Sequence, residues 1–95
     1  MLSMYPACFY KEKDGQYTVI FPDLNHLATC GTDLQNAMKM ATDCLAGFLY
    51  EAKLSNEAVP EPSELNTIDV NEEYSNYTEA FVNIVSAVSY THLRV

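Results

Sequence analysis

Residue types that build active sites gather in one stretch of the chain, YTVIFPDLNHLATCGTDLQNAMKMA, which covers residues 17–41. Asp23, His26 and Cys30 lie close together within it. A carboxylate, an imidazole and a thiol are the groups from which proteins make general bases, nucleophiles and metal ligands. Hydrolysis and metal binding are therefore the two chemistries that this stretch suggests.

Three aspartates, Asp14, Asp23 and Asp33, recur at nearly even spacing along the chain. Two of them converging on one divalent cation would give the site of a metal-dependent nuclease. Each also fits a structural role, because Asp14 belongs to an Asp-Gly hairpin signal, Asp23 to a Pro-Asp turn, and Asp33 to a helix start. These structural roles are favoured, and His26, in a turn between strands, is expected to be a surface residue.

The rest of the chain adds few groups for catalysis. The only other histidine, His92, lies in the last seven residues, and three glycines in total exclude a glycine-rich phosphate cradle. Cys8, Cys30 and Cys44 are odd in number and widely spaced, which predicts reduced thiols rather than disulfides or a zinc site. The sequence therefore predicts no catalytic residue, no metal site and no cofactor.

The composition restricts the class of partner. The 95 residues make one small domain with 13 acidic and 5 basic residues, a net charge of −8. Such a surface repels phosphate, so direct nucleic-acid binding is not expected, whereas a basic protein partner suits it. No apolar stretch is long enough to cross a membrane and no signal peptide is visible, which predicts a cytoplasmic protein. A core this small favours a homo-oligomer, most simply a dimer.

Alternating apolar residues predict four strands. In the first, YPACFYKE, Pro6 cannot donate to a ladder and is expected at the start of the strand or on an edge strand. An Asp-Gly pair then predicts a hairpin turn. The predicted strands cover residues 5–12, 16–21, 27–31 and 79–88.

One long amphipathic helix follows the third strand. Apolar residues at helical spacing run from Leu34 to Ala52. Thr32 is predicted to cap the helix with Gln35 completing a capping box, and Asn56 is predicted to end it. Gly47 is interpreted as a point where a strand approaches the helix closely.

The segment after the helix is acidic. Residues 57–79 contain two prolines, seven acidic residues and no Lys or Arg, which predicts an extended linker with a solvated charged face. The order of elements is then β-β-β-α-β. It predicts an α+β, two-layer domain, with one amphipathic helix packed on a mainly antiparallel sheet of three or four strands. Residues 1–88 form this domain, and residues 89–95 form a disordered or non-native tail.

The sequence resembles the HicB antitoxins of bacterial type II toxin–antitoxin systems. The resemblance rests on the strand that begins Tyr-Pro, on TVIFPDL, on TCGTD with the helix after it, on VPEPS and on EAFVNIVSAV. It implies a partial RNase H-like fold that lacks the catalytic carboxylates. It also implies binding to HicA, a small basic toxin that cleaves RNA, and obstruction of the catalytic histidine of that toxin.

Two departures from the family pattern stand out. Asn25-His26 replaces the frequent Pro-Gly after FPDL, although Asn tolerates the left-handed conformation that the turn needs. The chain ends in SAVSYTHLRV, where relatives continue into a DNA-binding module. Operator binding is therefore not expected of this chain.

The predicted function is an antitoxin domain that binds and neutralises a basic HicA-type toxin. Exposure and charge predict that the toxin contacts the turn and the acidic segment. The predicted toxin-binding residues are Phe21, Asp23, Leu24, Asp69, Glu72 and Glu73. Two alternatives remain open. One is a divalent-metal-dependent nuclease with Asp23 beside a second carboxylate, and the other is a stand-alone oligomeric regulatory module whose sheet pairs with another copy.

Overall fold

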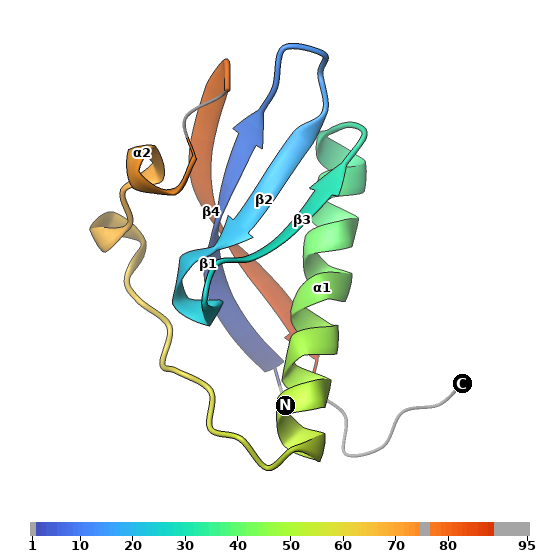
Figure 1. Ribbon diagram of the computed structural model, residues 1–95, viewed down its shortest axis with the longest axis vertical. Coiled ribbons are helices and arrows are strands. Elements are labelled where there is room, and N and C mark those ends of the chain that lie inside the picture. Colours follow the sequence, from blue (N-terminus) through green and yellow to red (C-terminus); the bar gives the residue numbers. More distant parts are fainter. Residues whose placement is uncertain (1, 75–76, 89–95) are drawn as a thin grey trace.

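The computed structural model describes residues 2–74 and 77–88, which form one sheet, one long helix and three short helical turns (Figure 1). The α+β class and the order of the main elements are confirmed. The predicted tail, residues 89–95, lies outside the described residues. In chain order the elements are β1 (Leu2–Lys11), β2 (Tyr17–Phe21), η1 (Pro22–Leu24), β3 (Leu27–Gly31), α1 (Leu34–Leu54), η2 (Leu65–Thr67), α2 (Val70–Glu73) and β4 (Glu79–Val88).

The sheet has four strands in the order β3-β2-β1-β4, and each neighbouring pair is antiparallel. The hairpin between β1 and β2 turns at Gly15, whose φ of +90° favours glycine. The backbone N–H of Glu12 closes this turn by donating to the carbonyl of Gln16. The last strand, β4, pairs with all ten residues of β1, so β1 is an interior strand.

The prediction for Pro6 is wrong in its placement, because β1 begins at Leu2 and is not an edge strand. The reason for the exception is local. β2 pairs with β1 only from Cys8 onward, so among the described residues Pro6 has β4 as its only strand neighbour. The bond from Glu12 to Gln16 shows that even-numbered residues of β1 point their backbone groups towards β2. The missing donor of Pro6 therefore faces the side where β2 has already ended.

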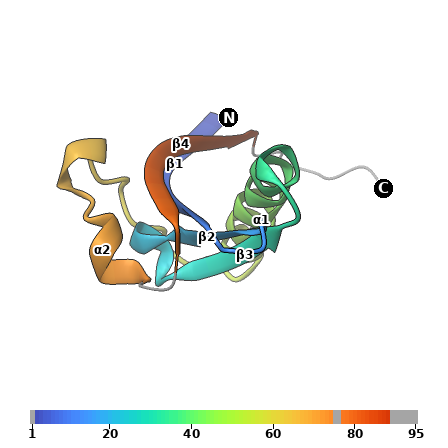
Figure 2. The ribbon, with the colours of Figure 1, turned by 90° about the horizontal axis from the view of Figure 1, so that it is seen from above.

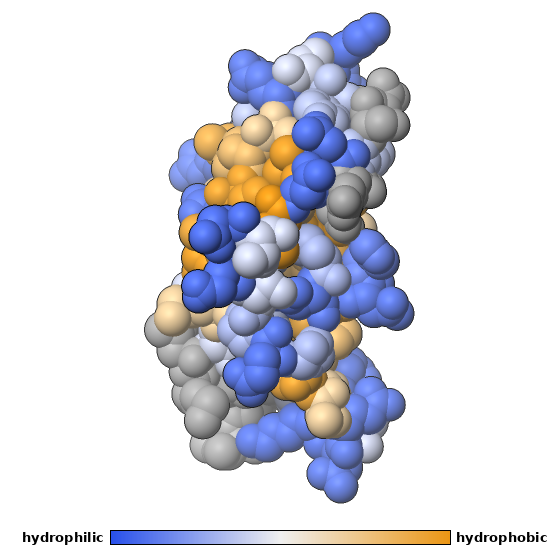
Figure 3. Space-filling view, turned by 90° about the vertical axis from the view of Figure 1, so that its left-hand side faces the viewer, coloured by the Kyte–Doolittle hydropathy of each residue, from blue (hydrophilic) through white to orange (hydrophobic). Residues whose placement is uncertain are grey.

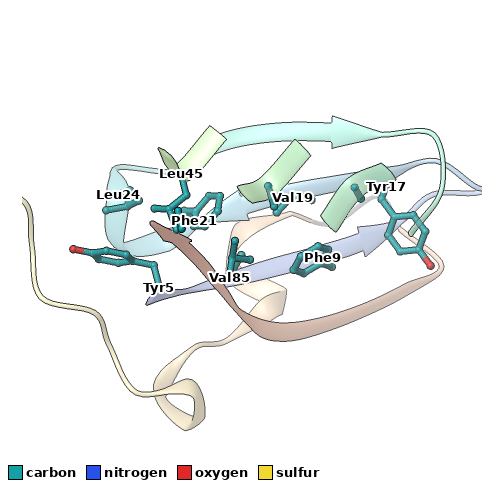
Figure 4. Packing of buried hydrophobic residues seen from close by; sticks show 12 residues of the cluster. Tyr5, Phe9, Tyr17, Val19, Phe21, Leu24, Leu45 and Val85 are labelled. Atoms are coloured by element: carbon teal, nitrogen blue, oxygen red, sulfur yellow. The ribbon is translucent and has the colours of Figure 1, made fainter. Parts of the chain in front are cut away.

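The main core lies between the sheet and α1. Side chains from one face of β1, β2 and β4 pack against alanines and a leucine on the helix (Figure 4). The small helix residues Ala37 and Ala41 let the sheet come close, and Leu45 reaches Phe21 at the other end of the core. The fully or nearly fully buried members are Tyr5, Ala7, Phe9, Tyr17, Val19, Phe21, Leu24, Ala37, Ala41, Leu45, Val85 and Ala87.

Both ends of α1 are closed by hydrogen bonds. The N-cap is Asp33 and not the predicted Thr32, because the Asp33 carboxylate accepts the backbone N–H of Asn36 at 2.8 Å. The Asn36 side chain in turn accepts the N–H of Thr32, the residue before the cap, at 2.9 Å, so Asn36 and not the predicted Gln35 makes this bond. At the other end Asn56 adopts φ 55°, as predicted, and the N–H of Glu57 donates back to the carbonyl of Ala52.

The close approach between strand and helix occurs at Gly31, and its prediction at Gly47 is wrong. A Cβ added to Gly31 would lie 2.5 Å from the backbone of Ala37, whereas one added to Gly47 would meet nothing within 4 Å. Gly31 therefore lets the end of β3 rest against the first turns of α1.

This contrast gives a matched pair of variants. Gly31→Ala should lower the free energy of unfolding by roughly 3 kcal/mol, because backbone atoms must move to admit the methyl group. Gly47→Ala should raise it by about 0.5–1 kcal/mol, because alanine loses less entropy in a helix. Urea denaturation followed by circular dichroism measures both, and equal effects of the two substitutions would contradict the placement of the contact at Gly31.

Candidate interaction surface

Residues 57–78 form a strap that runs from the end of α1 back along the other face of the sheet to β4 (Figures 1 and 2). The structure describes all of it except residues 75 and 76. Its first part, residues 57–64, has no regular structure, as the two prolines predict. The second part contains η2 and α2. Seen from above, α2 and α1 lie on opposite sides of the sheet (Figure 2).

Two residues of the sheet region hold the first part of the strap. The hydroxyl of Tyr5 donates to the carbonyl of Pro60 at 2.6 Å. Both carboxylate oxygens of Asp23 accept from Ser63, one from its N–H and one from its hydroxyl, each at 2.7 Å. Hydrogen bonds to an ionised acceptor are stronger than neutral ones. Asp23 is therefore the attachment point that links the turn after β2 to the strap.

The second part of the strap packs on the face of the sheet opposite α1. Ile68 and Val70 lie against Cys8 and Ile20. The hydroxyl of Tyr10 donates to the carbonyl of Val70 at 2.6 Å. A second, smaller core thus fixes the strap where the sequence predicts only a linker.

Tyrosines complete this second core. The rings of Tyr74 and Tyr77 both contact the ring of Tyr10, with centroids 5.2 Å away. The hydroxyl of Tyr74 donates to the Glu12 carboxylate at 3.1 Å, and this bond is the main reason that the pKa of Tyr74 is raised. The strap is consequently held at its beginning, its middle and its end.

The outer surface of the strap is acidic with apolar residues between the charges. The side chains of Glu57, Glu61 and Glu64 are exposed, and no Lys or Arg occurs between Lys53 and Arg94. Two apolar side chains are exposed in the same segment, Val59 at 37% and Leu65 at 42%. On the face that carries the strap and α2, hydrophilic side chains surround an apolar area in the upper half (Figure 3).

The predicted contact residues in the turn occupy different environments. The side chains of Phe21 and Leu24 are 0% and 2% exposed, so they belong to the core and offer no surface to a partner. Asp23 is partly buried by its bonds to Ser63. His26, as predicted, is exposed, and both Asn25 and His26 adopt the left-handed conformation, with φ of 59° and 60°.

The predicted contacts in the acidic segment lie around α2. Asp69 is exposed and caps α2 by accepting the N–H of Asn71 at 3.0 Å. Glu72 and Glu73 belong to α2 by their backbone, while their side chains lie outside what the structure describes. Sequence reasoning did not include Glu57, Glu61 and Glu64 among the contact residues. Only their charge and their expected exposure could have indicated them.

The aspartates do not converge. Asp14 accepts hydrogen bonds from Gln16, Asp23 from Ser63 and Asp33 from Asn36, each in its own part of the molecule. Within residues 2–74 and 77–88, no three His, Cys, Asp or Glu side chains gather as a metal site would require. The three cysteines are free, as predicted. No observation in the described part of the chain therefore favours a metal-dependent nuclease.

Comparison with known families decides the classification. A sequence model of the HicB-like antitoxin of bacterial toxin–antitoxin systems matches residues 5–95. The chain belongs to the HicB-like antitoxin family. A comparison with curated protein sequences gives no match. Among the described residues, no helix is long and apolar enough to cross a membrane.

Three solved structures of toxin–antitoxin proteins share the fold. A chain of a toxin–antitoxin complex from Streptococcus pneumoniae is 23% identical, with a TM-score of 0.80 over 100% of this chain and 78% of that one. A chain of the HicA3–HicB3 complex is 18% identical, with a TM-score of 0.70 over 90% and 99%. The N-terminal domain of Burkholderia pseudomallei HicB is 19% identical, with a TM-score of 0.68 over 87% and 95%.

The attachment of the strap at Asp23 can be measured with a double-mutant cycle. Asp23→Asn and Ser63→Ala should each lower the free energy of unfolding, by about 1.5–3 kcal/mol for a bond to a charged acceptor. The double variant should cost clearly less than the sum, because both substitutions remove the charge-assisted bond between the Ser63 hydroxyl and the Asp23 carboxylate. Additive costs in urea denaturation would show that Asp23 and Ser63 act independently.

Alkaline pH should release the beginning of the strap. Burial, and then the charges of Glu61 and Asp23, raise the pKa of Tyr5. A raised pKa means that folding favours the neutral phenol, so this stability is present below the ordinary tyrosine pKa and is lost as pH rises through the folded value. Amide exchange at residues 57–63 should accelerate over that alkaline range. In Tyr5→Phe exchange should already be fast at neutral pH, and an unchanged profile in this variant would contradict the assignment.

Proposed function

We propose that this chain is an antitoxin domain that binds a basic HicA-type, mRNA-cleaving toxin and neutralises it by covering its catalytic site. The domain acts by binding and not by catalysis, in the cytoplasm, without direct contact with nucleic acid. Family membership and the shared fold with chains of two toxin–antitoxin complexes support this function.

The observation that carries the proposal is the strap. It presents the carboxylates of Glu57, Glu61, Glu64 and Asp69 along one ordered segment that contains no cation. Hydrogen bonds from Tyr5 and Ser63 hold that segment in place before any partner arrives. A preorganised surface loses less conformational entropy on binding, so its charges contribute more to affinity.

Charge and apolar area have separate roles in this contact. A row of carboxylates accelerates encounter with a basic toxin and excludes acidic partners. Val59 and Leu65, exposed between the charges, provide the apolar area that an interface centre needs. The toxin-binding residues are therefore the acidic side chains of the strap, including Asp69 and the predicted Glu72 and Glu73, while Asp23 contributes by holding the strap.

The experiment is inhibition of RNA cleavage by the cognate HicA-type toxin. The wild-type chain in stoichiometric amount should abolish cleavage. Glu61→Gln with Glu64→Gln should weaken binding about tenfold, since an exposed charge pair contributes up to about 1 kcal/mol. Most of the loss should appear in the association rate and should shrink at high salt.

A double variant on α1 supplies the matched control. Asp43→Asn with Glu51→Gln changes the net charge by the same amount, but both residues are exposed on α1 and neither belongs to the strap. Binding should remain within about twofold of wild type. Equal losses from both double variants would show that net charge alone matters, and unimpeded cleavage in the presence of the wild-type chain would refute the antitoxin function.

A further inference from the structure

The first part of the strap contains two prolines, Pro60 and Pro62, placed two residues apart. Each proline fixes its own φ at about −65°, and the residue before a proline is confined to the β and polyproline II regions. Glu64 has φ −75° and ψ 145°, which are polyproline II values. Residues 57–64, all of which the structure describes, form no helix or strand and run as an extended trace (Figure 1). These constraints favour a polyproline II helix, which has no internal hydrogen bonds, over residues 59–64.

Two sides of this helix carry different chemistry. A polyproline II helix has roughly three residues in each turn, so side chains three residues apart lie on the same side. One side, the acidic side, carries Glu61 and Glu64, and both are exposed. Another, the apolar side, carries Val59, Pro62 and Leu65, where Val59 is 37% and Leu65 is 42% exposed. The charges and the apolar groups of the strap are therefore sorted into two parallel rows.

The third side attaches the strap to the rest of the molecule. The carbonyl of Pro60 accepts the hydroxyl of Tyr5 at 2.6 Å, and the hydroxyl of Ser63 donates to Asp23 at 2.7 Å. Among residues 57–67, all of them described, only Ser63 is partly buried and the others are exposed. The attachment therefore leaves the acidic and the apolar side accessible together.

A polyproline II helix with free sides is a preformed ligand. Its backbone is already extended, so it loses little conformational entropy when a partner binds it. Proteins that bind such helices use grooves lined by aromatic rings, on which prolines and apolar side chains pack. A row of carboxylates beside the apolar row is complementary to Lys or Arg along one rim of the groove.

We propose that residues 59–65 dock as a polyproline II ligand in a groove of the basic toxin, and that this groove is lined by aromatic side chains with Lys or Arg along one rim. The apolar side packs on the rings and the acidic side pairs with the cations. The inference rests on the proposed function, because it takes the same partner, and it adds the mode of contact.

Charge complementarity selects this occupant. A second copy of the chain has a net charge of −8, and its own strap, residues 57–78, contains no Lys or Arg to pair with Glu61 and Glu64. Two such surfaces repel each other, whereas a basic groove attracts the acidic side and orients it.

The test is binding of the full chain to the cognate HicA-type toxin by surface plasmon resonance, with two variants of unchanged composition. Ala58→Val with Val59→Ala moves the valine from the apolar side to the acidic side. Binding should weaken about tenfold, because the contact loses one buried valine side chain. Val59→Leu with Leu65→Val exchanges two residues within the apolar side, so binding should stay within about threefold of wild type.

The outcomes separate this inference from the proposed function. A wild-type chain that does not bind the toxin refutes the function, and the inference with it. A wild-type chain that binds, together with equal affinities of the two exchanged variants, overturns the inference alone. In that case the order of side chains around the strap would not matter for the contact.

Nuclear magnetic resonance on the labelled wild-type chain gives a second test. Coupling constants should report φ of about −75° at Val59 and Glu61, and not the value of about −120° to −140° found in strands. When unlabelled toxin is added, the methyl groups of Val59 and Leu65 should shift upfield, because they enter the ring currents of aromatic side chains. The methyl groups of Leu34, which is 43% exposed at the first residue of α1, serve as the control and should not shift. Strand-like φ values, or unshifted methyl groups at Val59 and Leu65 in the complex, would overturn the proposal.

Discussion

Both faces of β1 are buried, and the arrangement of the other elements follows from this constraint. Phe9 packs on the helix side and Tyr10 on the opposite side, and neither is exposed. Alternating side chains of one strand point to opposite faces, so a strand whose residues 5–10 are all apolar needs a cover on each face. Helix α1 covers one face and the strap covers the other. A linker that stayed in solvent would leave the second face of β1 in contact with water.

Tyr5 and Tyr10 show how the same strand organises the strap. Their rings are buried, one on each face of the sheet, and their hydroxyls need partners. Both partners are backbone carbonyls of the strap, at Pro60 and Val70. The requirement that buried hydroxyls be satisfied therefore fixes the path of the strap at two points. The backbone that carries the acidic side chains between these points is therefore held in place, although the acidic side chains are not part of a core.

The sequence predicted elements whose signals are local. The hairpin at Gly15, the strand of residues 27–31 and the left-handed residue Asn56 that follows the helix depend on neighbours along the chain. The sequence did not decide which of two adjacent residues caps a helix, because Asp33 caps α1 where Thr32 was predicted.

The strap could not be predicted because its bonds are long-range. Asp23 lies 40 residues from Ser63, and Tyr10 lies 60 residues from Val70. Turn chemistry explained Asp23 well enough that nothing pointed to a distant partner. Phe21 and Leu24 look exposed in a turn beside Pro22, and their packing in the main core, with residues of the sheet and of α1, buries them. The acidic composition of the strap was visible, whereas its order was not.

The position of β4 at the end of the fold has a consequence for synthesis. Leu2 pairs with Val88 and Lys11 with Glu79, so the largest strand pairing joins segments that are far apart in the chain. Contacts of this kind close large loops and slow folding. During translation β1 can acquire β2 and the helix, but its other edge stays open until residues 79–88 leave the ribosome. The emerging chain therefore carries an unpaired apolar strand edge for most of its synthesis, and this edge is an aggregation hazard until the last strand closes it.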